Sequence, residues 1–208
     1  TTSGSTGLTI TLGKQVEEVG WDGKPDDKAS NSDADSDAKS DVKLKTSSAG
    51  TFAGTRVLKY AVVPGNVHYV AVDDVLYEID GSNVYLAAYP THRKAGEFTV
   101  PPTVESKSVT AVKPSAFAGA EKLTKVVLCG KLKTIGTGAF KGASSISNIT
   151  IGSNITSISY GGDFEGGGSC FEDCSGLKEI IVVEVKEDGT SGAEVSNSVD
   201  AEHPYYSK

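Results

Sequence analysis

Residues 136–159 read GTGAFKGASSISNITIGSNITSIS, and the stretch holds five isoleucines, Ile146, Ile149, Ile151, Ile155 and Ile158. Their spacing fits neither an α-helix, in which apolar residues recur about every 3.6 positions, nor a single strand, in which they alternate. The five stand 6, 9, 11, 15 and 18 residues after Phe140. Apolar residues stand at the same intervals after Phe117, namely Leu123, Val126, Leu128, Leu132 and Ile135. Two adjacent copies 23 residues apart predict a repeat protein.

Less complete copies extend the repeat over most of the chain. A copy from Phe171 follows an insertion of eight residues in the Gly-rich stretch 161–169, and two fragments cover 8–20 and 97–112. A weaker copy from Phe52 places these residues in the core: Leu58, Ala61, Val63, Val67 and Val70. Each unit is expected to hold a strand, a second extended segment and a tight turn at the Phe. Because no unit can bury its apolar side chains alone, about six units should stack as a solenoid.

The composition restricts the class of protein and the kinds of partner. In the 208 residues, 20 basic and 27 acidic side chains give a net charge of −7 and a pI near 5.0, which disfavours nucleic acid and anionic lipid as partners. No apolar run approaches the ~18 residues of a membrane-spanning helix. The sequence contains no Met, and its first residues, TTSGSTG, lack the features of a signal peptide. We therefore expect a mature or trimmed polypeptide whose targeting segment is missing, with residues 1–7 as a spacer.

Two motifs of the repeat resemble a known family. They are the stretch 135–140, IGTGAF, and the spacing of Phe171, Cys174 and Leu177. Both are similar to the BspA-like, or Treponema-type, leucine-rich repeats of bacterial surface proteins, and the block at 72–90, VDDVLYEIDGSNVYLAAYP, is similar to a hairpin that this family places between repeats. The resemblance implies a curved, right-handed solenoid on a secreted or surface-anchored protein, such as a lipoprotein, with adhesion as its role. It brings no catalytic residues and no cofactor.

The expected fold is mostly β, formally α+β, with short strands, few or no regular helices and one inserted hairpin. A single repeat domain should span 8–185. It should contain an acidic loop at 22–41, the hairpin block at 70–90 and the Gly-rich insert at 161–169. Residues 186–208 are expected to form a C-terminal cap or tail.

The acidic stretch 22–41, DGKPDDKASNSDADSDAKSD, is too polar to join a core, so we expect a solvated loop. Its alternating acidic residues leave a weak cation site as the alternative, because Ca²⁺ prefers several carboxylate oxygens. An EF-hand starting at Asp33 would need Gly at 38 and Glu at 44, where the chain has Ala38 and Leu44. We therefore predict no dedicated metal site.

Groups that carry chemistry are sparse along the chain. His68, His92 and His203 lie far apart, and no nucleophile motif occurs. Cys170 and Cys174 lack further ligands at zinc-binding spacing and are expected to be buried thiols. An enzyme acting on polysaccharide would carry paired acids and an Arg on one face, and the chain has only two arginines. The sequence favours a binding or adhesion module, then a structural spacer of a larger surface protein, and an enzyme last.

The surface available to a partner follows from the strand pattern. In a strand, the side chains between the buried ones point to the opposite face. Positions 8 and 10 residues after each Phe are therefore the candidate binding residues: Tyr60, Val62, Lys125, Val127, Asn148, Thr150, Glu179 and Ile181. The alternative for Val62, Val127 and Ile181 is that β-branched residues simply suit strands, and that some exposed apolar surface is normal. The expected partner is an extracellular protein or glycan bound by a monomer, and Tyr205 and Tyr206 are a second candidate surface or a cover for the last turn.

Overall fold

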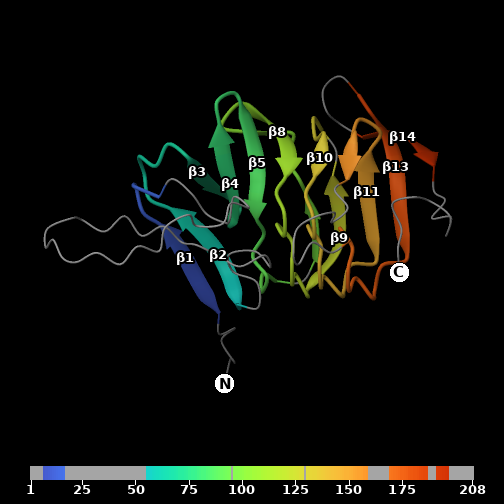
Figure 1. Ribbon diagram of the computed structural model, residues 1–208, viewed down its shortest axis with the longest axis horizontal. Coiled ribbons are helices and arrows are strands. Elements are labelled where there is room, and N and C mark those ends of the chain that lie inside the picture. The colour runs from blue at the N-terminus through green and yellow to red at the C-terminus, as the bar shows by residue number, and fades with distance from the viewer. Residues whose placement is uncertain are drawn as a thin grey trace, which may run out of the picture.

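The computed structural model of this chain describes residues 7–16, 55–94, 96–128, 130–158, 169–186 and 191–196. These residues fold into strands joined by turns, without a helix among them. Figure 1 shows the strands along the long axis of the molecule, from β1 in blue to β13 and β14 in red. The order of the strands in space therefore follows their order in the chain, as in a solenoid.

Two sheets run along the stack. The five-stranded sheet consists of the parallel strands β6 (Gly96–Thr99), β9 (Leu123–Leu128), β11 (Asn148–Gly152) and β13 (Glu179–Val185), with β14 (Ser191–Ser196) antiparallel at its edge. The seven-stranded sheet has a parallel part, β5 (Asn83–Ala88), β8 (Lys107–Val112), β10 (Thr134–Ile135) and β12 (Ser157–Ile158). Three antiparallel strands complete this sheet. β4 (Val75–Asp80) pairs with β5, β3 (Tyr69–Val72) pairs with β4, and β7 (Thr103–Val104) pairs with β8. Each coil gives one strand to each sheet, which makes the coils β5–β6, β8–β9, β10–β11 and β12–β13.

The turn between the two strands of a coil carries an aromatic side chain, and these rings form a ladder. The ring centroids of Phe117 and Phe140 lie 4.8 Å apart with planes 7° from parallel, and those of Phe140 and Phe171 lie 5.6 Å apart at 21°. Tyr89 continues the ladder, 5.3 Å from Phe117. It stands 28 residues before Phe117, so a search at 23-residue spacing misses it. The first coil is therefore a full repeat with Tyr in place of Phe.

Backbone hydrogen bonds join the same turns along the stack. Each of Tyr89, Phe117 and Phe140 donates its backbone N–H to the carbonyl of the residue that precedes the next aromatic ring. The three bonds measure 2.7, 2.7 and 2.9 Å and end on Ala116, Ala139 and Cys170. Buried peptide groups that a helix would satisfy within itself are thus satisfied by the neighbouring coil.

The core lies between the two sheets and confirms the predicted apolar intervals. The five apolar residues that follow Phe117 are at most 2% exposed. After Phe140, Ile146 and Ile149 are fully buried, whereas Ile151, Ile155 and Ile158 are partly buried and pack against the same core. Leu177, in the last coil, is also only partly buried. Burial therefore decreases toward the end of the stack, where no further described coil covers the apolar face.

The weaker copy expected from Phe52 is wrong in its inward positions. Val63 and Val67, which it places in the core, are 40% and 70% exposed, and the buried residues of β2 (Val57–Val62) are Val57 and Tyr60. A Pro-Gly turn directly after Val63 takes the chain out of the sheet, so the 23-residue unit does not continue there. Instead, β2 pairs in parallel with β1 (Leu8–Leu12) as a separate two-stranded sheet.

The hairpin predicted at 70–90 consists of β3 and β4. Asp73 and Asp74 join them with φ values of 50° and 66°, as expected of a two-residue type I′ turn. A third strand of the same block, β5, pairs with β4 on one side and in parallel with β8 on the other. The insertion therefore leads directly into the first coil of the parallel stack.

Several predicted segments lie outside the described residues. They include the acidic stretch 22–41, positions 161–168 of the Gly-rich insert, and residues 197–208 with Tyr205 and Tyr206. Of the expected C-terminal cap, β14 is described and pairs with β13. The predicted domain boundaries and the loop interpretation of the acidic stretch remain predictions.

The ring ladder predicts a graded loss of stability. Phe140→Ala should lower the free energy of unfolding by about 3–5 kcal/mol, because a fully buried ring stacked on both sides is replaced by a cavity. Phe171→Ala should cost less, because that ring is partly exposed and, among the rings of the described residues, only Phe140 stacks on it. Urea denaturation of both variants measures the difference, and equal losses would contradict the ladder as the source of stability.

Replacing Gly by Ala should reduce stability by different amounts at Gly136 and Gly142. In Gly136→Ala, the new Cβ would lie 2.4 Å from the backbone nitrogen of Pro114 in the neighbouring coil, and we expect a loss of about 1–3 kcal/mol or more. In Gly142→Ala, the nearest atom is 3.9 Å away, so only the left-handed backbone at φ 71° opposes Ala, at about 1–2 kcal/mol. Gly142→Asn should recover part of the second loss and Gly136→Asn none of the first, as measured by thermal denaturation.

Candidate functional site

Two rows of side chains cross the outer face of the five-stranded sheet. Val126, Leu128 and Ile149 point into the core, so the residues between them point outward. In the first row, Lys125 pairs in register with Asn148 and Asn148 with Glu179. In the second row, Val127 pairs with Thr150 and Thr150 with Ile181. The structure therefore brings together six of the eight predicted binding residues.

Polar contacts join some members of the first row to their neighbours. The Asn148 Nδ2 donates to the Glu179 Oε2 over 2.7 Å, and the Ser147 hydroxyl donates to the Asn148 Oδ1 over 2.8 Å. The Lys125 ammonium lies 3.6 Å from a Glu97 carboxylate oxygen. Both members of this ion pair are substantially exposed, so it adds little to stability. The row therefore carries charges of both signs on the outer face of the sheet.

The second row is less polar and less exposed. Val127 and Ile181 are half-buried, and Thr150 between them is 9% exposed. The accessible atoms of this row therefore lie mainly on the two aliphatic side chains. Thr150 is a supporting residue at its centre and offers little surface of its own.

Glu97 and Thr99 extend both rows and were missed by the sequence analysis. They lie on β6, in register with Lys125 and Val127. The predicted outward positions were counted from Phe residues. β6 was missed because the aromatic residue before it is Tyr89. The alternation of Glu97, Phe98, Thr99 and Val100 is the signal that could have identified them, because Phe98 and Val100 are buried.

Tyr60 and Val62 do not belong to this surface. The expected exposure of Tyr60 is wrong, because its side chain is 3% exposed and packs in a second core cluster with Tyr69 and Leu76. Burial raises the pKa of its hydroxyl well above the usual value. Val62 is half-buried and pairs with Leu12 in the two-stranded sheet. The physical reason for both outcomes is that β2 lies in a different sheet from β9, β11 and β13.

A metal site would need several titratable side chains of the described residues to lie together. No group of three or more His, Cys, Asp or Glu side chains in the described ranges is arranged to hold a metal ion. Cys170 and Cys174 are free thiols, and the Cys174 Sγ donates to the Phe140 carbonyl at 3.0 Å. His92 has its pKa lowered, first by desolvation and then by Arg56. Within the same ranges, no helix is both long and apolar enough to span a bilayer.

Residues 103–190 match a family model described as a BspA type leucine rich repeat region (6 copies). Over these residues the chain is similar to BspA-type leucine-rich repeats. The match covers the coils β8–β9, β10–β11 and β12–β13, in which the Phe ladder and the outer rows lie. It confirms the predicted family and the mostly β leucine-rich-repeat solenoid.

Solved structures of similar proteins come from bacteria. A leucine rich repeat protein of Treponema pallidum is 22% identical with a TM-score of 0.43, and the match covers 50% of this chain and 45% of that one. A leucine rich cell surface protein of Faecalibacterium prausnitzii is 21% identical with a TM-score of 0.31, covering 60% and 41%. A leucine-rich repeat protein of Eubacterium ventriosum is 18% identical with a TM-score of 0.48, covering 84% and 42%. The chain thus spans less than half the length of each, and no curated protein matches it.

The buried thiols predict a loss of stability at alkaline pH. Burial raises the pKa of Cys170 to about 12 and that of Cys174 to about 11, from an ordinary value near 9.0. The unfolded chain therefore releases these protons first, so the stability they confer is full below about pH 9 and falls as the pH rises toward the folded-state values. Between pH 8.5 and 10, the wild type should lose about 1–2 kcal/mol more than C170A/C174A in urea denaturation. Parallel pH dependences of the two proteins would contradict the assignment.

Proposed function

We propose that this BspA-type region is a non-catalytic binding module of a bacterial surface protein, and that it holds an extracellular protein or glycan on the outer face of the five-stranded sheet. The alignment of the two outer rows supports the proposal. Lys125, Asn148 and Glu179 offer charges and an amide at fixed spacing, and Val127 and Ile181 offer half-exposed aliphatic surface beside them. A mixed patch of this kind suits recognition, because apolar contact supplies affinity and charge supplies selectivity.

The rigidity of the scaffold favours this use. The strands that carry the rows are fixed from behind by the Phe ladder and by the hydrogen bonds between coils. A partner would therefore meet side chains that are already in place, and little ordering entropy would be lost on binding. We infer that the module acts as a single chain, secreted or anchored at the cell surface.

A structural spacer is the second candidate function. The continuous core of the four coils favours it, because each coil covers its neighbour. A screen of the wild-type protein against host matrix proteins and glycans separates the two functions. A specific partner supports binding, failure to bind any supports the spacer, and release of product from a glycan would contradict a non-catalytic role.

The outer rows predict a loss of binding without a loss of fold. V127D/I181D should abolish binding to a partner found in that screen, because two carboxylates replace the aliphatic part of the patch. T103D/S157D is the matched control, since it adds the same charges at exposed positions of the seven-stranded sheet that do not pair with each other. Circular dichroism and melting temperature should stay close to wild type for both. Unaltered binding by V127D/I181D would eliminate this face, and equal losses in both variants would indicate a general charge effect.

A further inference from the structure

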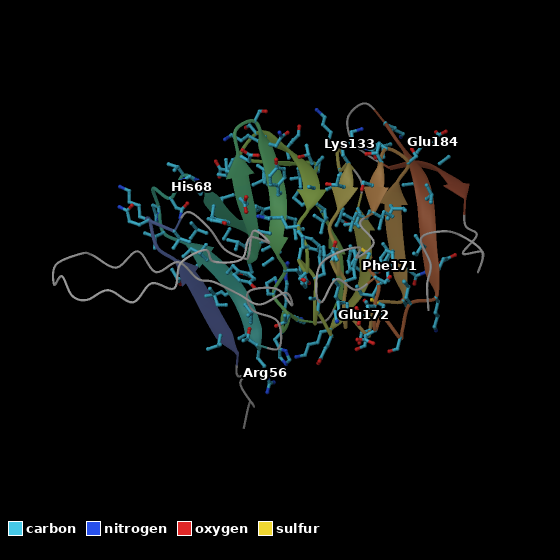
Figure 2. All side chains as sticks on the ribbon, viewed as in Figure 1. Arg56, His68, Lys133, Phe171, Glu172 and Glu184 are labelled. Atoms are coloured by element: carbon cyan, nitrogen blue, oxygen red, sulfur yellow. The ribbon has the colours of Figure 1, made fainter. Side chains whose placement is uncertain are left out.

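A second feature of the molecule lies on the edge where the strands of the five-stranded sheet end and the chain turns into the seven-stranded sheet. A cleft of about 500 Å³ opens there. It is lined by polar and basic residues from successive coils, namely Asn83, Ser108, Thr110, Gly130, Lys131, Lys133, Asn154, Val185 and Lys186. Figure 2 shows Lys133 on this edge, with Glu172 near the opposite edge.

The charge of the cleft is opposite to that of the chain. Its lining carries three ammonium groups and no carboxylate, on a protein whose net charge is −7. Lys131, Lys133 and Lys186 are exposed, and no ion pair joins any of them to a residue in the described part of the chain. Glu184 lies on the same edge but does not line the cleft. The fold has thus gathered positive charge that its own described acids do not neutralise.

The shape of the cleft fits an extended ligand. Its lining runs from the start of β5 to the end of β13, across all four coils. Neighbouring strands lie about 4.8 Å apart, so Lys131, which follows β9, and Lys186, which follows β13, are separated by about 10 Å along the stack. A linear polymer with negative groups about 10 Å apart can contact both lysines at once.

The remaining side chains indicate the class of polymer. Asn83, Ser108 and Thr110 provide amide and hydroxyl groups, which donate to and accept from the hydroxyls of a sugar. No aromatic side chain lines the cleft, so the stacking that single-stranded nucleic acid uses is missing from the described lining. We propose that this cleft binds a segment of an acidic polysaccharide, with the lysines on its carboxylate or sulfate groups. The site is separate from the outer rows and does not rest on the function proposed for them.

The experiment compares the whole chain with two triple variants of equal charge. The cleft variant is K131Q/K133Q/K186Q, and the control K14Q/K59Q/K94Q removes three exposed lysines that lie outside the cleft. Polygalacturonate and dextran sulfate are the acidic probes, and neutral dextran has the uncharged backbone. We expect the wild type to bind at least one acidic probe and not dextran. The affinity of the cleft variant for that probe should be lower by a factor of about ten or more. The control should stay within twofold of wild type.

Each outcome decides the proposal. Tighter binding of polygalacturonate identifies carboxylate as the preferred group, and tighter binding of dextran sulfate identifies sulfate. Equal losses in the two triple variants would show a response to net charge and overturn the site, as would failure to bind either acidic probe. Tighter binding of a single-stranded oligonucleotide through the same lysines would overturn it in favour of nucleic acid. K133Q alone should have an unchanged melting temperature and an intermediate affinity. That result would show that the weaker binding is not caused by loss of the fold.

Discussion

The stacking of aromatic rings at the turns is the interaction on which the rest of this structure depends. Phe117 and Phe140 lie nearly parallel at 4.8 Å, close to the spacing of neighbouring strands. The rings therefore set the same rise per coil as the two sheets, and the turn hydrogen bonds repeat at that rise. Without an aromatic residue at this point, the turn would leave a hole between the sheets along the whole stack. The ladder replaces the helix that other repeat architectures use to close each coil.

Equal rise in the turns and sheets has a direct consequence for the surface. Because every coil advances by the same distance, residues at the same position in successive coils lie side by side, and outward side chains form straight rows. The row of Lys125, Asn148 and Glu179 is such a case. A binding surface therefore requires no separate scaffold: it follows from the choice of residues at positions that the core leaves unconstrained.

Sequence reasoning succeeded where the repeat is regular and failed where the chain departs from it. The intervals after Phe117 and Phe140 identify the inward residues because burial allows only apolar side chains there. The same counting from Phe52 failed at Val63 and Tyr60, because a Pro-Gly turn and an antiparallel hairpin replace the next coil. Strand order is a long-range property, and no local pattern shows that β2 joins β1 in its own sheet. The cleft was missed for a similar reason, since its lysines come from turns that only the stack brings together.

The positions of the lysines show which features the fold does not demand. Lys133 accepts a backbone bond from Thr156 and donates one to Thr110, so these three residues occupy equivalent places in successive coils. In two of the three coils this position holds Thr, so neither packing nor hydrogen bonding requires a charged side chain there. Gly136 is different, since Pro114 in the preceding coil leaves no room for a Cβ. Within a repeat, residues that the geometry requires explain the fold, and those that it merely tolerates are where a ligand is to be sought. By that criterion the outer rows and the lysine cleft are the parts of the described surface where we propose that ligands bind.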